Sequence, residues 1–314
     1  MTDMMLPLPI QVWLAADAYE GKNDLSHISA TTLIKDSHKI VLENQIENEL
    51  DTSDEGLLNM FASKRGTAIH SALENVWTND NLRNKALDAL GLKELKERIV
   101  INKHKENPNQ IEIWLEQRAY KKIDDMTVNG QFDMVMDGQL IDYKNTSAFT
   151  YMHKTKVEDY KIQGSIYRWL NPNLITSDTI KIIYIMHDWT AKNAKINPDY
   201  PQSPVIDEDY DLYSLDYTED YIKNKIQEIK NGGESECTKS LKLSDPVWQY
   251  FSKAGGKAIK NFNNQTDANH YVMTKGKGFI RIKPQKATGC KYCKARSICK
   301  QYADLLLQGL VDSD

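Results

Sequence analysis

The sequence predicts a mixed α/β fold, in which a central sheet is flanked by helices, on three observations. Apolar residues recur at helical spacing over residues 57–77 and again over residues 160–170. Between these two segments, residues 111–120 and 130–145 alternate polar and apolar side chains, as strands do. After them, residues 180–187 are typical of a buried strand. Because helices and strands follow one another in this order, we expect one mixed sheet with helices packed on it.

The remaining segments suggest three parts. A second helix is expected over residues 82–99 and another over residues 217–230, while the polar, proline-containing stretch 197–209 is predicted to be a surface loop. The domains expected from these patterns are an N-terminal helical and irregular segment (1–60), an α/β core (61–230) and a basic, cysteine-containing lobe packed on that core (231–314).

The composition is that of a water-soluble globular protein. Hydrophobic residues make up 40% of the chain and charged residues 27%, which is ordinary for that class. No run of 18 apolar residues exists, and the first 20 residues lack the basic-then-apolar layout of a signal peptide. We therefore expect a cytoplasmic protein, of a bacterial host if the chain is phage-encoded, with no membrane partner.

Charge is distributed unevenly along the chain. Between Lys239 and Lys300 there are 14 basic residues and two acidic ones, a net of +12, whereas the whole chain carries −4. The rest of the chain is therefore strongly acidic. A basic lobe of this kind can contact the phosphates of DNA, although a solvated basic surface without a partner would have the same composition.

A hairpin carries the strongest chemical signal. Asp137-Gly138 lies between alternating apolar residues, which is a strong signature of a two-residue hairpin turn. The turn would pair Met136 with Gln139 and so fix the register of the whole hairpin.

This register brings charged side chains together. Asp133 would lie opposite Asp142, and Gln131 opposite Lys144, with all four side chains on one face because strand residues alternate. Two facing carboxylates repel one another, and a hard divalent cation with oxygen ligands would compensate for that repulsion. Lys144 could then orient the attacking water. The alternative is a solvent-exposed edge on which Asp133 and Lys144 simply pair.

The motif Gly130-x-x-Asp133 followed by Asp142-x-Lys144 resembles the PD-(D/E)XK nuclease superfamily, and more closely its RecB-like exonuclease branch, in a phage-type form. Three flanking pieces fit the same pattern in the same order: His70 at the end of Gly66-Thr67-Ala68-Ile69-His70, Glu116 on the strand before the hairpin, and Gln163-x-x-x-Tyr167 on a later helix. Each piece alone also has an ordinary structural explanation, such as a surface histidine, a salt bridge or a half-buried helix face.

The resemblance implies a restriction-endonuclease-like core and a set of roles. Asp133 and Asp142 would bind Mg²⁺ or Mn²⁺, and Lys144 would position the hydrolytic water. Gln163 and Tyr167 would hold DNA or brace the site. Further metal ligands would be His70, Glu116 and the backbone carbonyl of Tyr143.

The activity implied by the resemblance is exonucleolytic hydrolysis of DNA, serving phage or mobile-element replication or recombination. A single-strand-binding or recombination protein would then be a further partner. Two alternatives stay open: a non-catalytic DNA-binding or inhibitory protein on a nuclease fold, and a nuclease that acts on RNA.

The four cysteines are Cys237, Cys290, Cys293 and Cys299, and the last three have the spacing C-x2-C-x5-C. In a cytosolic protein such clustering favours a metal centre over disulfides. The spacing differs from the paired C-x2-C knuckles of structural zinc, so we expect a 4Fe–4S cluster, with structural Zn²⁺ as the alternative. Either centre would clamp the basic C-terminal lobe.

The cysteine pattern resembles that of RecB-like nucleases with one difference. Those proteins combine a C-x2-C-x5-C cluster with a distant cysteine that precedes the nuclease motifs. In this chain Asp36-Ser37-His38 stands near the expected position, and Cys237 follows the motifs instead.

Overall fold

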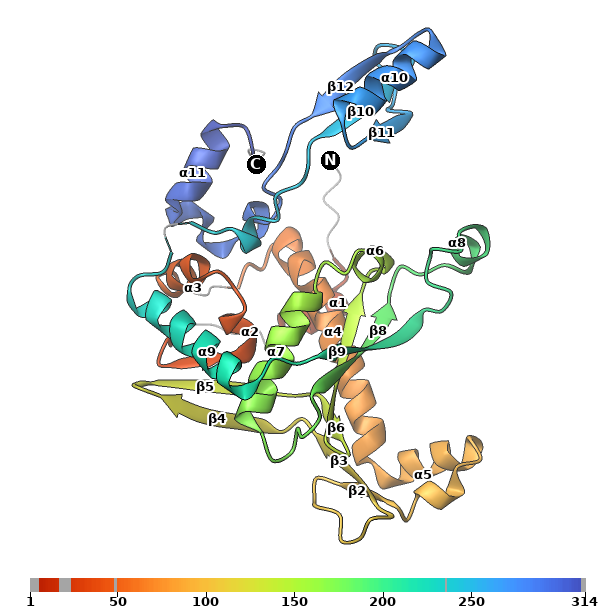
Figure 1. The fold of residues 1–314 in the computed structure, drawn as a ribbon, viewed down its shortest axis with the longest axis vertical. Helices are drawn as coiled ribbons and strands as arrows, with labels where there is room; N and C mark the ends of the chain where they lie inside the picture. Colours follow the sequence, from red (N-terminus) through yellow and green to blue (C-terminus); the bar gives the residue numbers. More distant parts are fainter. Residues whose placement is uncertain (1–5, 17–23, 48–49, 235, 312–314) are drawn as a thin grey trace. The chain divides into compact units, whose positions relative to one another are not determined.

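The computed structural model describes residues 6–16, 24–47, 50–234 and 236–311, and the chain forms two compact units. The first unit comprises Met1–Ile34 and Glu47–Ile226, and the second comprises Lys35–Ile46 and Gln227–Asp314. The predicted mixed sheet flanked by helices is confirmed in the first unit (Figure 1). Within the described ranges, the structure has no helix with the length and hydropathy that a membrane crossing needs.

The main sheet of the first unit has six strands in the order β2-β3-β6-β7-β8-β9. The pairs β2–β3 and β7–β8 are parallel and the other three pairs are antiparallel, so the sheet is mixed. The six strands are β2 (Ile99–Ile101), β3 (Ile111–Leu115), β6 (Met134–Met136), β7 (Gln139–Thr146), β8 (Thr179–Met186) and β9 (Val205–Asp211).

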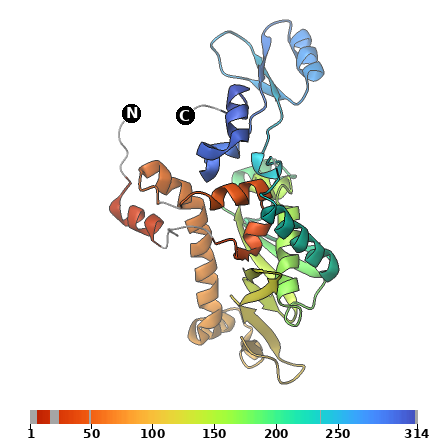
Figure 2. The same ribbon diagram turned by 90° about the vertical axis from the view of Figure 1, so that its left-hand side faces the viewer.

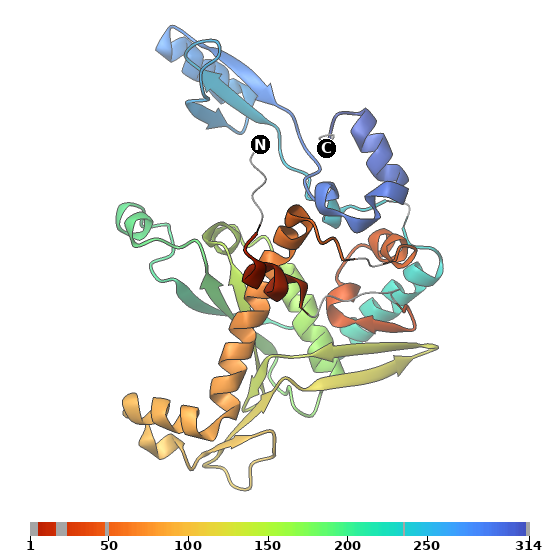
Figure 3. The same cartoon turned by 180° about the vertical axis from the view of Figure 1, so that it is seen from behind.

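Two helices cover opposite faces of this sheet. Helix α4 (Asp54–Thr78) crosses one face, where Trp77 packs on a buried cluster that includes Ile113 and Ile141 (Figure 3). Helix α7 (Val157–Leu170) lies on the other face, where its backbone approaches the sheet closely at Gly164. Neighbouring residues of β7 therefore face different helices, as the alternation of a strand requires.

A second, three-stranded sheet has the order β1-β5-β4 and extends from the main one. Its strands are β1 (His27–Ser29), β4 (Arg118–Ile123) and β5 (Met126–Gln131). The chain passes from β5 to β6 through Phe132, whose side chain is completely buried, and so moves from one sheet to the other. The other helices of this unit are α1 (Leu8–Ala15), α2 (Ala30–Leu33), α5 (Asp80–Ala89), α6 (Ala148–Met152), α8 (Ala191–Ile196) and most of α9 (Leu215–Lys230).

Most predicted elements are present, and three predictions were wrong. The helix predicted over 82–99 ends at Ala89, because the chain continues through a short 3₁₀ turn (Lys93–Leu95) into β2. The strand predicted over 111–120 is interrupted at Glu116, which has a positive φ of 50°. Part of the stretch 197–209 is not a loop: β9 is a polar edge strand, whose acidic side chains are partly neutralised by Lys181.

The second unit contains the cysteines and a small sheet. Strands β10 (Val247–Phe251), β11 (Lys260–Phe262) and β12 (Phe279–Lys283) are antiparallel in the order β11-β10-β12, and α10 (Gln265–Lys275) lies against them (Figure 2). The other elements of the unit are α3 (Ser37–Asn44), α11 (Lys300–Leu307) and the 3₁₀ turns Lys239–Leu241, Cys290–Tyr292 and Lys294–Ile298.

We predict that Gly164→Ala destabilises the first unit by about 1–3 kcal/mol, the usual cost of overfilling a packed interior. A Cβ atom at Gly164 would lie 2.7 Å from Ile180 Cδ1 and 3.0 Å from Leu212 Cδ2. Gly66→Ala is the matched control, because a Cβ there meets nothing within 4 Å and alanine favours a helix. Urea unfolding of the two variants should shift in opposite directions; equal midpoints would contradict the close approach of α7.

Candidate metal centre and cysteine site

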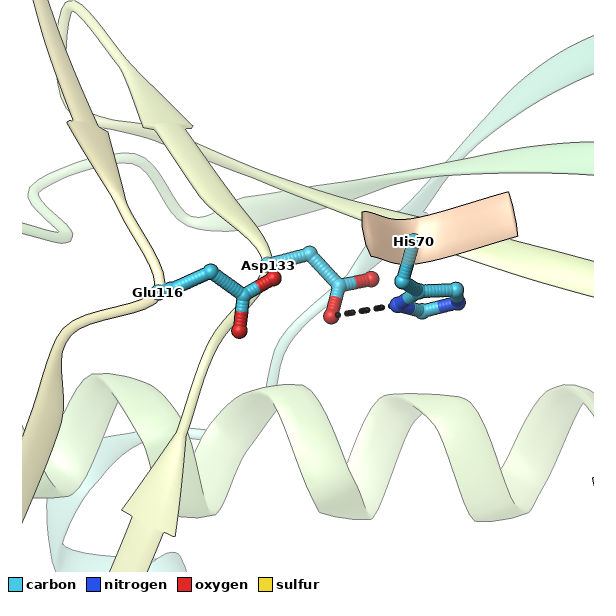
Figure 4. Close-up of side chains that lie close together, drawn as sticks. All are labelled: His70, Glu116 and Asp133. Carbon is cyan, nitrogen blue, oxygen red and sulfur yellow. Dashed lines mark hydrogen bonds and ion pairs between the residues drawn. The ribbon is translucent and has the colours of Figure 1, made fainter. Parts of the chain in front are cut away.

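Three side chains from distant parts of the chain meet beside the main sheet. His70 comes from the middle of α4, Glu116 from the bend between β3 and β4, and Asp133 from the bend between β5 and β6. One ligand atom from each residue lies within 4.8 Å of the other two, and within the described ranges no other trio of His, Cys, Asp or Glu residues does so. In Figure 4 the Asp133 carboxylate lies between His70 and Glu116. An imidazole and two carboxylates are a suitable donor set for Mn²⁺ or Mg²⁺.

His70 is fixed by both nitrogens of its ring. Nδ1 lies 3.1 Å from Asp133 Oδ1, and Nε2 lies 3.0 Å from the backbone carbonyl oxygen of Tyr143. Both neighbours are hydrogen-bond acceptors, so both nitrogens donate only when the ring is an imidazolium. In agreement, the hydrogen bond to Asp133 raises the pKa of His70. In the metal-free protein this cation supplies the charge that a metal ion would otherwise provide.

The two carboxylates of the trio are in different environments. Asp133 Oδ2 accepts a hydrogen bond of 2.8 Å from the backbone N–H of Tyr143, so β7 fixes its position. Glu116 Oε2 accepts a bond of 2.9 Å from Gln131 Nε2. Burial, followed by the negative charges of Asp133 and Glu74, raises the pKa of Glu116 to about 7. A pKa raised this far means that ionising the Glu116 carboxyl group costs free energy in the folded protein, and a bound cation would remove that cost.

Asp142 and Lys144 form a buried pair next to the trio. Their side chains project from β7 towards α7, and Lys144 Nζ lies 2.6 Å from Asp142 Oδ2. Burial raises the pKa of Asp142, while the Lys144 charge acts in the opposite direction. Lys144 also donates to Gln163 Oε1 at 3.2 Å, so its ammonium group is held between α7 and the Asp142 carboxylate.

Gln163 and Tyr167 brace this pair and do not reach the trio. Gln163 Nε2 donates to the Tyr167 hydroxyl at 2.7 Å, and both side chains are buried on α7. Their i, i+4 spacing places them on one helix face, as the motif predicted. Gln163 therefore contacts Lys144 directly, and Tyr167 contacts Gln163.

The hairpin register is confirmed over three pairs, from Met134–Ile141 to the turn; the predicted Asp133–Asp142 pair lies beyond the end of this ladder, and the predicted Gln131–Lys144 pair was wrong. Met136 pairs with Gln139, and the turn residues Asp137 and Gly138 have φ angles of 45° and 86°. Gln131, however, pairs with Arg118 in the other sheet and does not face Lys144. The ladder ends early because the chain bends at Phe132 and Asp133.

A cavity of about 380 Å³ opens beside the trio. His70 and Glu116 both contribute to its wall, so these two candidate ligands are accessible from it. Its lining residues are Gly66, Thr67, His70, Ser71, Glu74 and Glu116.

The four cysteines line one cavity in the second unit. None of them is in a disulfide. Cys237 is more than 50 residues from the other three in the sequence, yet it lines the same cavity. Burial raises the pKa of Cys237 to about 12 and also raises the pKa of Cys290. Four thiols around one cavity are a donor set that suits either an iron–sulfur cluster or a zinc ion.

Sequence reasoning assigned no role to the segment that precedes the first unit's long helix. Residues 35–46 belong to the cysteine-containing unit, where Asp36 accepts hydrogen bonds from the backbone N–H groups of Lys239 and Ser240. His38 Nε2 lies 3.8 Å from Cys299 Sγ. The only signal in the sequence was that Asp36-Ser37-His38 stands where the related pattern has its distant cysteine.

Comparisons with known proteins add a distant likeness of shape. No protein-family model matches the chain, and no curated protein sequence matches it. One similar solved structure is that of SSO0001, with 14% identity and a TM-score of 0.41 over 69% of this chain and 83% of the other. Another is a phage related exonuclease from Haemophilus somnus 129PT, with 13% identity and a TM-score of 0.28 over 68% and 94%. At these scores neither likeness bears on the reaction.

We predict that the affinity of the metal-free protein for Mn²⁺ rises up to about tenfold per pH unit below pH 7. The metal needs an ionised carboxylate, and Glu116 keeps its proton until the pH approaches about 7. Isothermal titration at pH 6 to 8 measures the slope. Glu116→Gln should bind more weakly and with a shallower slope; an unchanged slope would show that Glu116 is not a ligand.

The same shifts predict a stability effect in the metal-free protein. The pKa values of Glu116, Asp142 and His70 are all raised in the folded state, so folding binds protons. Stability that depends on these protons is present at low pH and is lost as the pH rises, for Glu116 between 4.5 and about 7. Thermal unfolding in EDTA should therefore move to lower temperature across this range, and Mn²⁺ should reverse the change. A melting temperature that rises with pH would contradict this electrostatic account.

Proposed function

We propose that the protein is a metal-dependent nuclease that hydrolyses phosphodiester bonds of DNA. The observation that carries the proposal is the meeting of His70, Glu116 and Asp133 beside the buried Asp142–Lys144 pair. Carboxylates and an imidazole gathered beside a lysine, next to an open cavity, are the groups that metal-assisted phosphodiester hydrolysis requires.

The residues divide the work between binding the cation and positioning the reactants. Bound Mg²⁺ or Mn²⁺ would polarise the phosphoryl oxygen and lower the pKa of a coordinated water. His70, Glu116, Asp133 and Asp142 would hold that ion, with the Tyr143 carbonyl available once the His70 proton has left. Lys144 would orient the attacking water and offset charge on the phosphate.

Side chains of α7 surround the Lys144 ammonium group. Lys144 donates a hydrogen bond to Gln163, and Gln163 donates one to Tyr167. These hydrogen bonds fix the position of the ammonium group in addition to its ion pair with Asp142. The Tyr160 ring lies 5.0 Å from Lys144 Nζ and closes another side. A lysine restrained in this way is preorganised for developing negative charge.

We further propose that the activity is exonucleolytic and that the cysteine site holds a 4Fe–4S cluster with a structural role. The C-x2-C-x5-C spacing supports the cluster over Zn²⁺, and all four thiols line one cavity that could hold it. The basic residues of the second unit would contact the phosphate backbone. The competing function is non-catalytic DNA binding, and RNA is the competing substrate.

We predict that Asp142→Ala lowers metal-dependent cleavage of end-labelled linear DNA by at least about 100-fold, because it removes a cation contact and the partner of Lys144. Asp199→Ala, which alters an exposed aspartate in the loop before β9, is the matched control. Closed circular DNA and RNA are assayed in parallel with Mg²⁺ and Mn²⁺. Cleavage of circles would indicate an endonuclease, preferred cleavage of RNA would change the substrate, and no cleavage by the native protein would favour the non-catalytic function.

We predict that Cys290→Ser loses the metal and lowers the thermal stability of the second unit, because one of the four thiolates is removed. Iron, zinc and sulfide analysis with the visible absorption spectrum identifies the centre. Ser297→Ala, in the same segment, should retain both metal and stability. A fully metallated and equally stable Cys290→Ser variant would rule out a single four-cysteine site.

A further inference from the structure

The small sheet β1-β5-β4 has two different faces. Ala119, Lys121 and Ile123 of β4 share one face with Val128 and Gly130 of β5, and α2 and α7 pack on that side (Figure 1). Arg118, Tyr120 and Lys122 project from the opposite face because strand residues alternate. Among the described elements, helices pack on this sheet from the inner side only (Figure 3).

The outer face presents one aromatic ring between two cations. Tyr120 is 63% exposed, and Arg118 and Lys122 are exposed on either side of it. The Lys122 side chain has no hydrogen bond or ion pair with any described residue, and no described carboxylate pairs with Arg118. Residues two apart on a strand are about 7 Å apart, so the three side chains form a track roughly 14 Å long.

Hydrogen bonds connect this track directly to the candidate metal centre. The Arg118 guanidinium donates to Gln131 Oε1 at 2.6 Å and to Asn129 Oδ1 at 3.1 Å. Gln131 in turn donates to Glu116 at 2.9 Å. The guanidinium is therefore held in one orientation, and its end of the track is one side chain away from a proposed metal ligand.

We propose that the outer face of the β4–β5 hairpin binds single-stranded DNA and leads it to the His70–Glu116–Asp133 centre. This inference rests on the nuclease function proposed above and specifies the form of the substrate. Alternating phosphate and base contacts suit an extended strand: Arg118 and Lys122 contact phosphates, and an unpaired base stacks on Tyr120. In a duplex the bases are already stacked on one another and leave no face for Tyr120.

Charge also limits the length of the track. The hairpin turn that follows Lys122 contains Asp124 and Asp125, both exposed, which would repel a phosphate backbone. The strand would therefore be held between this acidic turn and the metal centre. The track is long enough for two or three nucleotides, which is a short contact suited to a chain end.

The test is binding of a short fluorescent oligothymidylate in EDTA, so that no cleavage occurs, measured by anisotropy at several salt concentrations. Tyr120→Ala should weaken binding by about tenfold, whereas Tyr120→Phe, which keeps the ring, should bind as the native protein does. Lys122→Ala should lower the slope of log Kd against log salt by about 0.7, the value for one lost phosphate contact on a single strand.

Lys121→Ala is the matched control. Lys121 is adjacent in sequence and equally cationic, but its ammonium lies on the inner face, 3.9 Å from the centre of the Trp169 ring. The Lys121→Ala variant should leave unchanged both the affinity for the oligothymidylate and the slope of log Kd against log salt. Equal effects of Lys121→Ala and Lys122→Ala, an unaffected Tyr120→Ala variant, or equally tight binding of a blunt duplex would each overturn the proposal.

The outcome is separable from that of the nuclease proposal, because binding is measured without metal and without cleavage. If the native protein fails to cleave DNA but Tyr120→Ala loses single-strand binding, the binding face stands and the catalytic function falls. If Asp142→Ala abolishes cleavage while Tyr120→Ala binds normally, the catalytic function stands and the binding face falls. Mn²⁺ affinity of Tyr120→Ala should equal that of the native protein, which shows that the metal centre is intact.

Discussion

The position of His70 is the constraint on which the candidate site depends. Its ring bonds Asp133 on one side and the Tyr143 carbonyl on the other, and so ties α4 to both strands of the hairpin. Without this cation, Asp133 and Glu116 would be two partly buried carboxylates with little to balance them. The proton on His70 holds these groups together without a metal ion, and the proposed metal would take over its charge.

The Asp142–Lys144 ion pair, unlike the His70 contacts, is not expected to add much to the stability of the fold. A buried ion pair contributes little to stability, because desolvation of both charges offsets their attraction. Hydrogen bonds from Lys144 to Gln163 and from Gln163 to Tyr167 fix the pair in place on the α7 side of the sheet. The pair shares β7 with the Tyr143 backbone that holds Asp133, so a single strand aligns both halves of the site.

The cysteine-containing unit is built from two distant pieces of chain. Residues 35–46 contribute α3, and the Asp36 carboxylate satisfies backbone N–H groups next to the Lys239–Leu241 turn. The unit has few long apolar elements, and burial raises the pKa of the Cys237 and Cys290 thiols. A metal centre that takes up the thiolates would join Cys237 to the segment 290–299, and so would stabilise the larger of the two pieces.

The sequence by itself determined the local features of this protein. Asp137-Gly138 specified the turn and with it the register of β6 and β7, apolar spacing specified α4 and α7, and the cysteine spacing specified a common site. Only the tertiary structure decided that Phe132 enters the core and ends the ladder, that Gln131 turns to Glu116, and that His38 lies beside Cys299. Turn geometry and side-chain periodicity act over a few residues and can be recognised in the chain, whereas these contacts depend on which distant surfaces exclude water together.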